Sequence, residues 1–100
     1  MRIKTGVIIK DMKPEILLGL ILAEPVLEKY REELVITSVC EGTHMAQSKH
    51  YFGEAADIRS RDIPPELRPV VLRELKVCLG ENFDVVLEED HFHIEFDPKG

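Results

Sequence analysis

The sequence predicts an α+β domain in which a small antiparallel sheet carries helices on one face. Two long segments with helical apolar spacing are separated by short runs of β-branched residues. Only three residues separate the last two of these runs, which is the spacing of a β-hairpin. One hundred residues of ordinary composition have room for a single domain, which we assign to residues 1–100.

The first half of the chain predicts one helix and one strand. Residues 14–30 are rich in leucine and isoleucine and predict a largely buried helix. Because proline cannot donate the intrahelical hydrogen bond, we expect this helix to bend or break around Glu24-Pro25. The β-branched run from Leu34 to Val39 predicts a buried strand. A long loop, residues 40–54, follows it, and loops of this length are commonly functional.

The second half predicts a strand, a helix and a hairpin. Residues 55–58 are expected to form a short central strand, in which two alanines permit close packing. A helix is expected to begin at Asp62 and to end at Gly80. Residues 83–87 and 91–96 then form the two strands of the hairpin.

Charge and composition restrict the partners. The formal net charge is −6 and no basic stretch interrupts the acidic background, so we expect no nucleic-acid partner. The apolar run near the N-terminus is too short for a signal peptide, and no run reaches membrane-spanning length. These features predict synthesis in the cytoplasm without membrane insertion. Cys40 and Cys78 lack metal-site or disulfide spacing and are expected to be reduced, partly buried thiols.

Alternation along the last predicted strand separates apolar from polar side chains. Phe92, Ile94 and Phe96 face one side, so the other side carries His91, His93 and Glu95. Both imidazoles are therefore expected to face a cleft or solvent. A catalytic zinc ion takes three protein ligands and leaves its fourth position to water. His50, Asp57 and one histidine of the hairpin would meet this requirement, although such donors suit several transition metals.

The residues around these candidates follow the pattern of a known family. Two motifs are present, Ser-x-His-x-x-Gly-x-Ala-x-Asp from Ser48 to Asp57 and Asp-x-x-His-Ile-Glu from Asp90 to Glu95. Together they resemble the D-alanyl-D-alanine carboxypeptidase and Hedgehog-type family of zinc peptidases, over roughly residues 34–97. The chain is most similar to the short phage members of that family.

The resemblance implies a fold of this family and a role for each matched residue. His50, Asp57 and His93 are the implied ligands of Zn²⁺, and Asp90 is the implied general base for the zinc-bound water. The implied reaction is hydrolysis of peptidoglycan stem peptides. The oligomeric state is left open, and release of a phage enzyme from the cytoplasm would need another protein.

Further residues are candidates for contact with substrate or metal. Ser48, His44 and Arg59 are possible substrate-binding residues, and Glu88 with His91 forms an alternative pair that offers a metal ligand or a base. The family usually places an arginine after its Thr-Ser strand, whereas this chain has Val39-Cys40-Glu41-Gly42. Two alternatives therefore stay open: a metal-binding or virion-structural domain without catalysis, and an interaction domain without metal.

Overall fold

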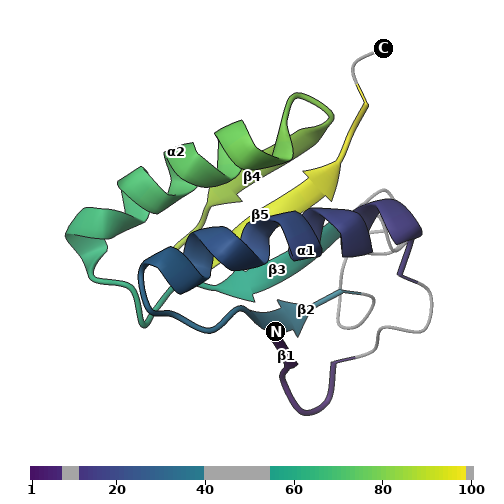
Figure 1. The fold of residues 1–100 in the computed structure, drawn as a ribbon. Coiled ribbons are helices and arrows are strands. Elements are labelled where there is room, and N and C mark those ends of the chain that lie inside the picture. The colour runs from purple at the N-terminus through teal and green to yellow at the C-terminus, as the bar shows by residue number, and fades with distance from the viewer. Residues whose placement is uncertain (8–11, 40–54, 99–100) are drawn as a thin grey trace.

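The fold is a five-stranded sheet covered on one face by two helices, in a computed structural model that describes residues 1–7, 12–39 and 55–98 (Figure 1). The elements, in chain order, are β1 (Arg2–Ile3), α1 (Pro14–Lys29), β2 (Val35–Ser38), β3 (Ala55–Arg59), the 3₁₀ turn η1 (Pro65–Leu67), α2 (Arg68–Leu79), β4 (Phe83–Leu87) and β5 (His91–Phe96).

The sheet has the strand order β1-β2-β3-β5-β4, with β3 at its centre. The pairs β2–β3, β3–β5 and β5–β4 are antiparallel, but β1 pairs with β2 in parallel. The predicted α+β class, the central strand and the hairpin are confirmed. The prediction of a wholly antiparallel sheet was wrong, because the two-residue β1 gives no detectable alternation in the sequence.

A bend or a break was predicted around Glu24-Pro25, and helix α1 continues through Pro25 without a break. One face of the helix is completely buried against the sheet, through Ile16, Leu20, Ala23 and Leu27. A proline inside a helix costs about 3 kcal/mol. Burial of a large aliphatic side chain contributes about 1.5–3 kcal/mol, and this face has three of them. Packing therefore outweighs the hydrogen bond that Pro25 removes.

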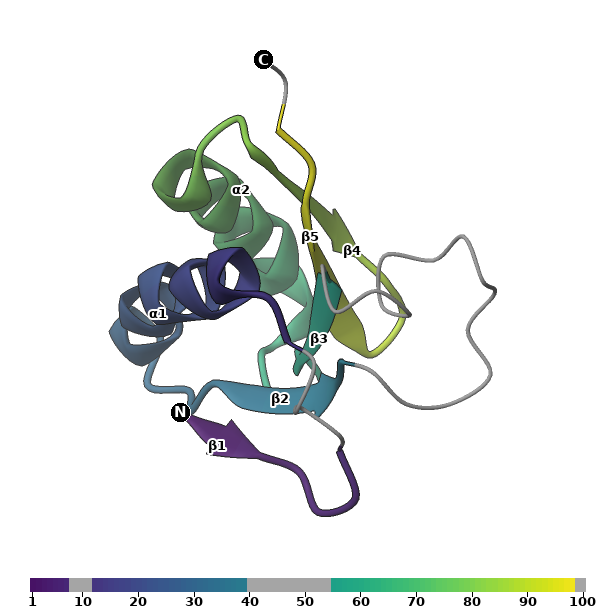
Figure 2. The same ribbon diagram turned by 90° about the vertical axis from the view of Figure 1, so that its right-hand side faces the viewer.

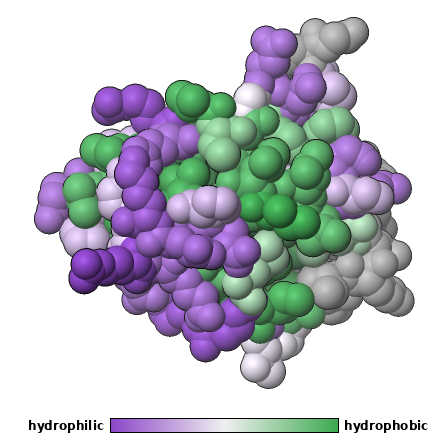
Figure 3. Space-filling view, viewed as in Figure 1, coloured by the Kyte–Doolittle hydropathy of each residue, from purple (hydrophilic) through white to green (hydrophobic). Residues whose placement is uncertain are grey.

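The opposite side of α1 is also apolar, but it lies at the surface. Leu17, Leu18 and Ile21 are 46–53% exposed, and Val77 of α2 is 80% exposed. The space-filling view shows hydrophobic side chains gathered over the two helices (Figure 3). The prediction of a largely buried helix was therefore wrong for this side, since an all-apolar sequence pattern does not distinguish a buried face from an exposed one.

Helix α2 begins later than predicted, at Arg68, after the 3₁₀ turn. The Arg68 guanidinium donates hydrogen bonds to the carbonyl oxygens of Ile63 (2.9 Å) and Arg61 (3.1 Å), which fixes the segment before the helix. Gly80 ends the helix with φ of 86°, as the sequence predicts. Cys78 on this helix is exposed rather than partly buried.

The two faces of the sheet differ completely (Figure 2). The face toward the helices carries the buried core, including Ile36, Ile58, Phe92 and Ile94. The approach of α1 is so close that a Cβ atom added to Gly19 would lie 2.7 Å from Cε1 of Phe83. In the described part of the chain the other face is not covered by a helix.

None of the described helices is both long and apolar enough to cross a membrane.

Candidate functional site

The candidate site lies on the uncovered face, where Asp57 of β3 and His93 of β5 are direct partners in the antiparallel register. Opposite residues of antiparallel strands project their side chains to the same face, with Cβ atoms about 4.5–5.5 Å apart. Oδ1 of Asp57 is 3.0 Å from Nδ1 of His93. Asp57 is only 8% exposed, so its carboxylate is a buried charge that requires polar partners.

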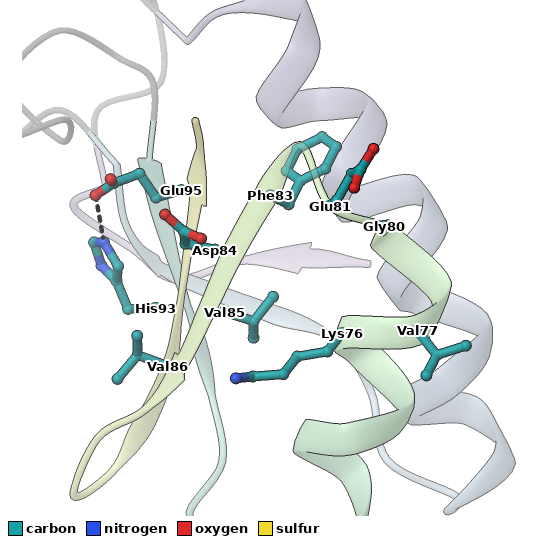
Figure 4. Close-up of a pocket in the computed structure, with 10 residues that line it drawn as sticks. All are labelled: Lys76, Val77, Gly80, Glu81, Phe83, Asp84, Val85, Val86, His93 and Glu95. Atoms are coloured by element: carbon teal, nitrogen blue, oxygen red, sulfur yellow. Dashed lines mark hydrogen bonds and ion pairs between the residues drawn. The ribbon is translucent and has the colours of Figure 1, made fainter. Parts of the chain in front are cut away.

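His93 lies between two carboxylates. Its Nε2 is 3.2 Å from Oε1 of Glu95, which is two residues further along β5 and therefore on the same face (Figure 4). The hydrogen bond with Asp57 raises the pKa of His93, burial of the ring partly opposes this, and Glu95 raises the pKa further. The imidazole is therefore held in a defined orientation and binds a proton more tightly than a free imidazole.

A second imidazole lies near the same carboxylate oxygen of Asp57. Nε2 of His91 is 3.6 Å from Oδ1 of Asp57, while Nδ1 of His91 is 2.7 Å from Oδ1 of Asp90. The hydrogen bond with His91 lowers the pKa of Asp90, whose carboxylate is otherwise 75% exposed. Asp90 thus orients the His91 ring so that its other nitrogen, Nε2, faces the carboxylate of Asp57.

The structure brings five of the residues proposed from sequence onto one surface: Asp57, Arg59, Asp90, His91 and His93. Glu88 is exposed, and its described contact with His91 is a backbone hydrogen bond of 2.8 Å from the Glu88 N–H. The remaining three candidates, His44, Ser48 and His50, lie outside the described residues.

The donor atoms of Asp57 and His93 fit two positions of a zinc site. Metal–ligand distances near 2.0–2.1 Å place neighbouring tetrahedral donors about 3.3 Å apart, close to the 3.0 Å observed. Within the described residues, three donor groups lie mutually within 4.8 Å only in the carboxylate cluster of Asp84, Glu95 and Asp97. Asp57 and the two histidines therefore do not converge on one point, and a zinc ion at Asp57 and His93 needs a third ligand from elsewhere.

Several neighbours of the site were not identified from the sequence. Glu95 was matched to a motif, but its contact with His93 was not predicted, although strand alternation places both on one face. The hydroxyl of Thr37 donates a hydrogen bond of 3.3 Å to the Asp57 carbonyl oxygen. Asp84 and Glu95 also line a groove of about 790 Å³ beside β4 (Figure 4). The contacts of Thr37 with Asp57 and of Asp84 with Glu95 depend on the cross-strand register, which the sequence does not give.

No model of a known protein family matches the chain, and no curated protein matches it significantly.

Proposed function

We propose that the protein is a zinc-dependent peptidase that cleaves peptidoglycan stem peptides. The observation that carries the proposal is the Asp57–His93 pair, in which Oδ1 and Nδ1 lie 3.0 Å apart on the face of the sheet that no described helix covers. A carboxylate and an imidazole at this separation are donors that zinc prefers. The sequence resemblance to the D-alanyl-D-alanine carboxypeptidase family supplies the reaction class.

In this proposal Asp57, His93 and His50 would hold the metal ion. Nδ1 of His93 is the nitrogen that faces Asp57, while Glu95 at Nε2 fixes the ring in place. A carboxylate behind a metal-binding histidine commonly sets the ring orientation and its basicity. When bound, zinc would acidify a water molecule and polarise the scissile carbonyl.

Asp90 and His91 would transfer the proton of the attacking water molecule. The resemblance makes Asp90 the base, and the 2.7 Å contact between Asp90 and Nδ1 of His91 suggests how it acts. We propose that the pair accepts a proton as the water oxygen attacks the carbonyl carbon. It then returns the proton to the amine nitrogen as the carbon–nitrogen bond breaks. Asp90→Asn should lower kcat by about 10²–10⁴-fold while zinc stays bound, as measured by metal analysis and peptide cleavage.

His91→Gln distinguishes direct from relayed proton transfer. If Asp90 acts through His91, this variant loses about as much activity as Asp90→Asn. If Asp90 acts directly, His91→Gln keeps most of the activity. Glu66→Gln is the matched control, because Glu66 is an exposed carboxylate on η1 that does not line the site.

Substrate contacts would come from Arg59 and, by the resemblance, from His44 and Ser48. Arg59 is the cross-strand partner of His91, and its side chain is only 18% exposed. An arginine in this position is available to a carboxylate or carbonyl group of a peptide that lies on the uncovered face.

The decisive experiment combines zinc analysis of the purified protein with digestion of muropeptides followed by mass spectrometry. One zinc ion per chain with cleavage of a peptide bond supports the proposal, and loss of both in Asp57→Asn connects them to the site. Zinc binding without cleavage would favour the alternative of a metal-binding domain that lacks catalysis. Cleavage that survives complete removal of metal would contradict the proposal.

A further inference from the structure

A small cavity next to the candidate metal site is lined by three cationic side chains. Lys4, Arg59 and Arg61 surround about 80 Å³ together with Thr37, Asp90 and His91. The chain as a whole carries a net charge of −6. A concentration of three cations in so small a space is therefore a local feature that the overall composition does not explain.

Each cation is brought to the cavity by a different part of the fold. Lys4 follows β1, and its backbone N–H donates a 2.9 Å hydrogen bond to the carbonyl oxygen of Ile36 in β2. Arg59 is the last residue of β3. Arg61 comes two residues later, where its carbonyl oxygen accepts the 3.1 Å hydrogen bond from Arg68. Backbone interactions thus fix the positions from which the side chains extend.

Among the described residues, few carboxylates compensate the positive charge of the cavity. Within the part of the chain that the structure describes, Arg59 forms one ion pair, with Asp62 at 3.7 Å, and solvent weakens this pair because the Asp62 side chain is 59% exposed. Neither Lys4 nor Arg61 forms an ion pair with any described residue. The carboxylate of Asp90, which also lines the cavity, is already hydrogen-bonded to His91.

We infer that Lys4, Arg59 and Arg61 bind a carboxylate group of the substrate and thereby set its orientation over the site. The inference rests on the proposed peptidase function. Arg59 is two residues from Asp57 along β3, which corresponds to about 7 Å of extended chain. The preferred substrates are therefore peptides with a carboxylate about two residues from the scissile bond. That carboxylate belongs either to the chain terminus or to an acidic side chain.

The test compares three forms of one cleavable stem peptide: a free C-terminal carboxylate, the C-terminal amide, and an amide with an acidic side chain at the same distance. The double variant Lys4→Gln/Arg61→Gln removes two charges and keeps Arg59. Arg73→Gln is the matched control, because Arg73 is an exposed arginine of α2 away from the cavity.

The wild-type protein should favour one or both carboxylate forms over the plain amide, and the preferred form identifies the source of the carboxylate. In the double variant kcat/KM for that form should fall about 10- to 100-fold, mainly through KM, since each charged hydrogen bond contributes substantially. Cleavage of the plain amide should stay nearly constant, and Arg73→Gln should behave as wild type. Equal cleavage of all three forms by wild-type protein would overturn the inference and leave the peptidase function intact.

A binding measurement covers the case in which no peptide is cleaved. N-acetylalanine and its amide are titrated into the protein while NMR follows the signals of Thr37 and His91. Shifts caused by the carboxylate alone, and lost in the double variant, support the pocket even if the proposed function fails. Equal shifts from both probes, or shifts that persist in the double variant, refute it. Circular dichroism checks that the variant is folded.

Discussion

The two faces of the sheet use the same strands in different ways. On β3 and β5, Ile58, Phe92 and Ile94 point into the helix-covered core and are completely buried. Asp57 and His93, their immediate neighbours in sequence, point to the uncovered face and contact each other. The covered face is held by many closely packed apolar contacts, whereas the other face depends on a few specific polar pairs. Substitutions on the first should therefore change stability, and those on the second should change ligand binding.

The largest effect is expected on the covered face. Phe92→Ala removes the largest completely buried side chain of the described residues, on β5 between β3 and β4. We expect the free energy of unfolding to fall by about 3–5 kcal/mol, through lost burial and the cavity that remains. Urea denaturation followed by circular dichroism measures this. A loss below about 1 kcal/mol would mean that the core is not packed as described.

A smaller loss is expected where α1 touches the sheet. In Gly19→Ala the new Cβ would lie 2.7 Å from Phe83, which is too close for carbon atoms. The Phe83 ring or the helix must shift, and we expect a cost of about 1–3 kcal/mol in the free energy of unfolding. The double variant Gly19→Ala/Phe83→Leu provides the control. If the clash causes the loss, Gly19→Ala should lower the free energy of unfolding by less in the Phe83→Leu variant than in the wild-type protein.

On the uncovered face we expect a substitution at Glu95 to change ligand binding. Glu95→Gln replaces the carboxylate that is hydrogen-bonded to Nε2 of His93 with a neutral amide. We expect zinc affinity to fall about 10- to 100-fold, as is typical when the partner of a metal-binding histidine is changed. Isothermal titration calorimetry with zinc measures this, and Glu66→Gln, at an exposed carboxylate of η1 away from the groove, is the control. If Glu95→Gln leaves the zinc affinity unchanged, Glu95 does not support His93 as a zinc ligand.

The sequence predicts the face of a strand more readily than its cross-strand partner. Alternation was enough to place His91, His93 and Glu95 on one side of β5, because side-chain direction has a strict period of two. That Asp57 pairs with His93 depends on the register between β3 and β5, and the strands are separated by more than thirty residues. Lys4 could not be predicted as a neighbour of the site, because β1 is too short to be recognised.

The outcomes for α1 have a related physical cause. The sequence predicts a bend or a break around Pro25, and the helix does not break because burial against the sheet offsets the cost of proline. Leu17, Leu18 and Ile21 lie on the surface because α1 has more apolar side chains than the sheet can cover. Both results depend on how much sheet surface lies under the helix, and that quantity emerges only from the assembled fold.

The pH dependence of stability tests the uncovered face through proton binding at His93. Its pKa in the folded, metal-free protein is raised above the ordinary value of 6.5 by Asp57 and Glu95. A raised pKa stabilises the folded state fully below the unfolded pKa, and this contribution is lost as pH rises through the folded pKa. Urea unfolding of the metal-free protein should therefore show stability declining from about pH 6 upward, and His93→Gln should remove this part of the decline.

Zinc should reverse this trend over the same pH range. A metal ion at Nδ1 of His93 competes with the proton, so zinc affinity should increase as pH rises through the raised pKa. With excess zinc the free energy of unfolding should therefore rise with pH where that of the metal-free protein falls. Parallel curves with and without zinc would place the metal away from His93. If the stability curves with and without zinc diverge with pH in the wild-type protein but not in His93→Gln, the proton and the metal ion bind to the same nitrogen of His93.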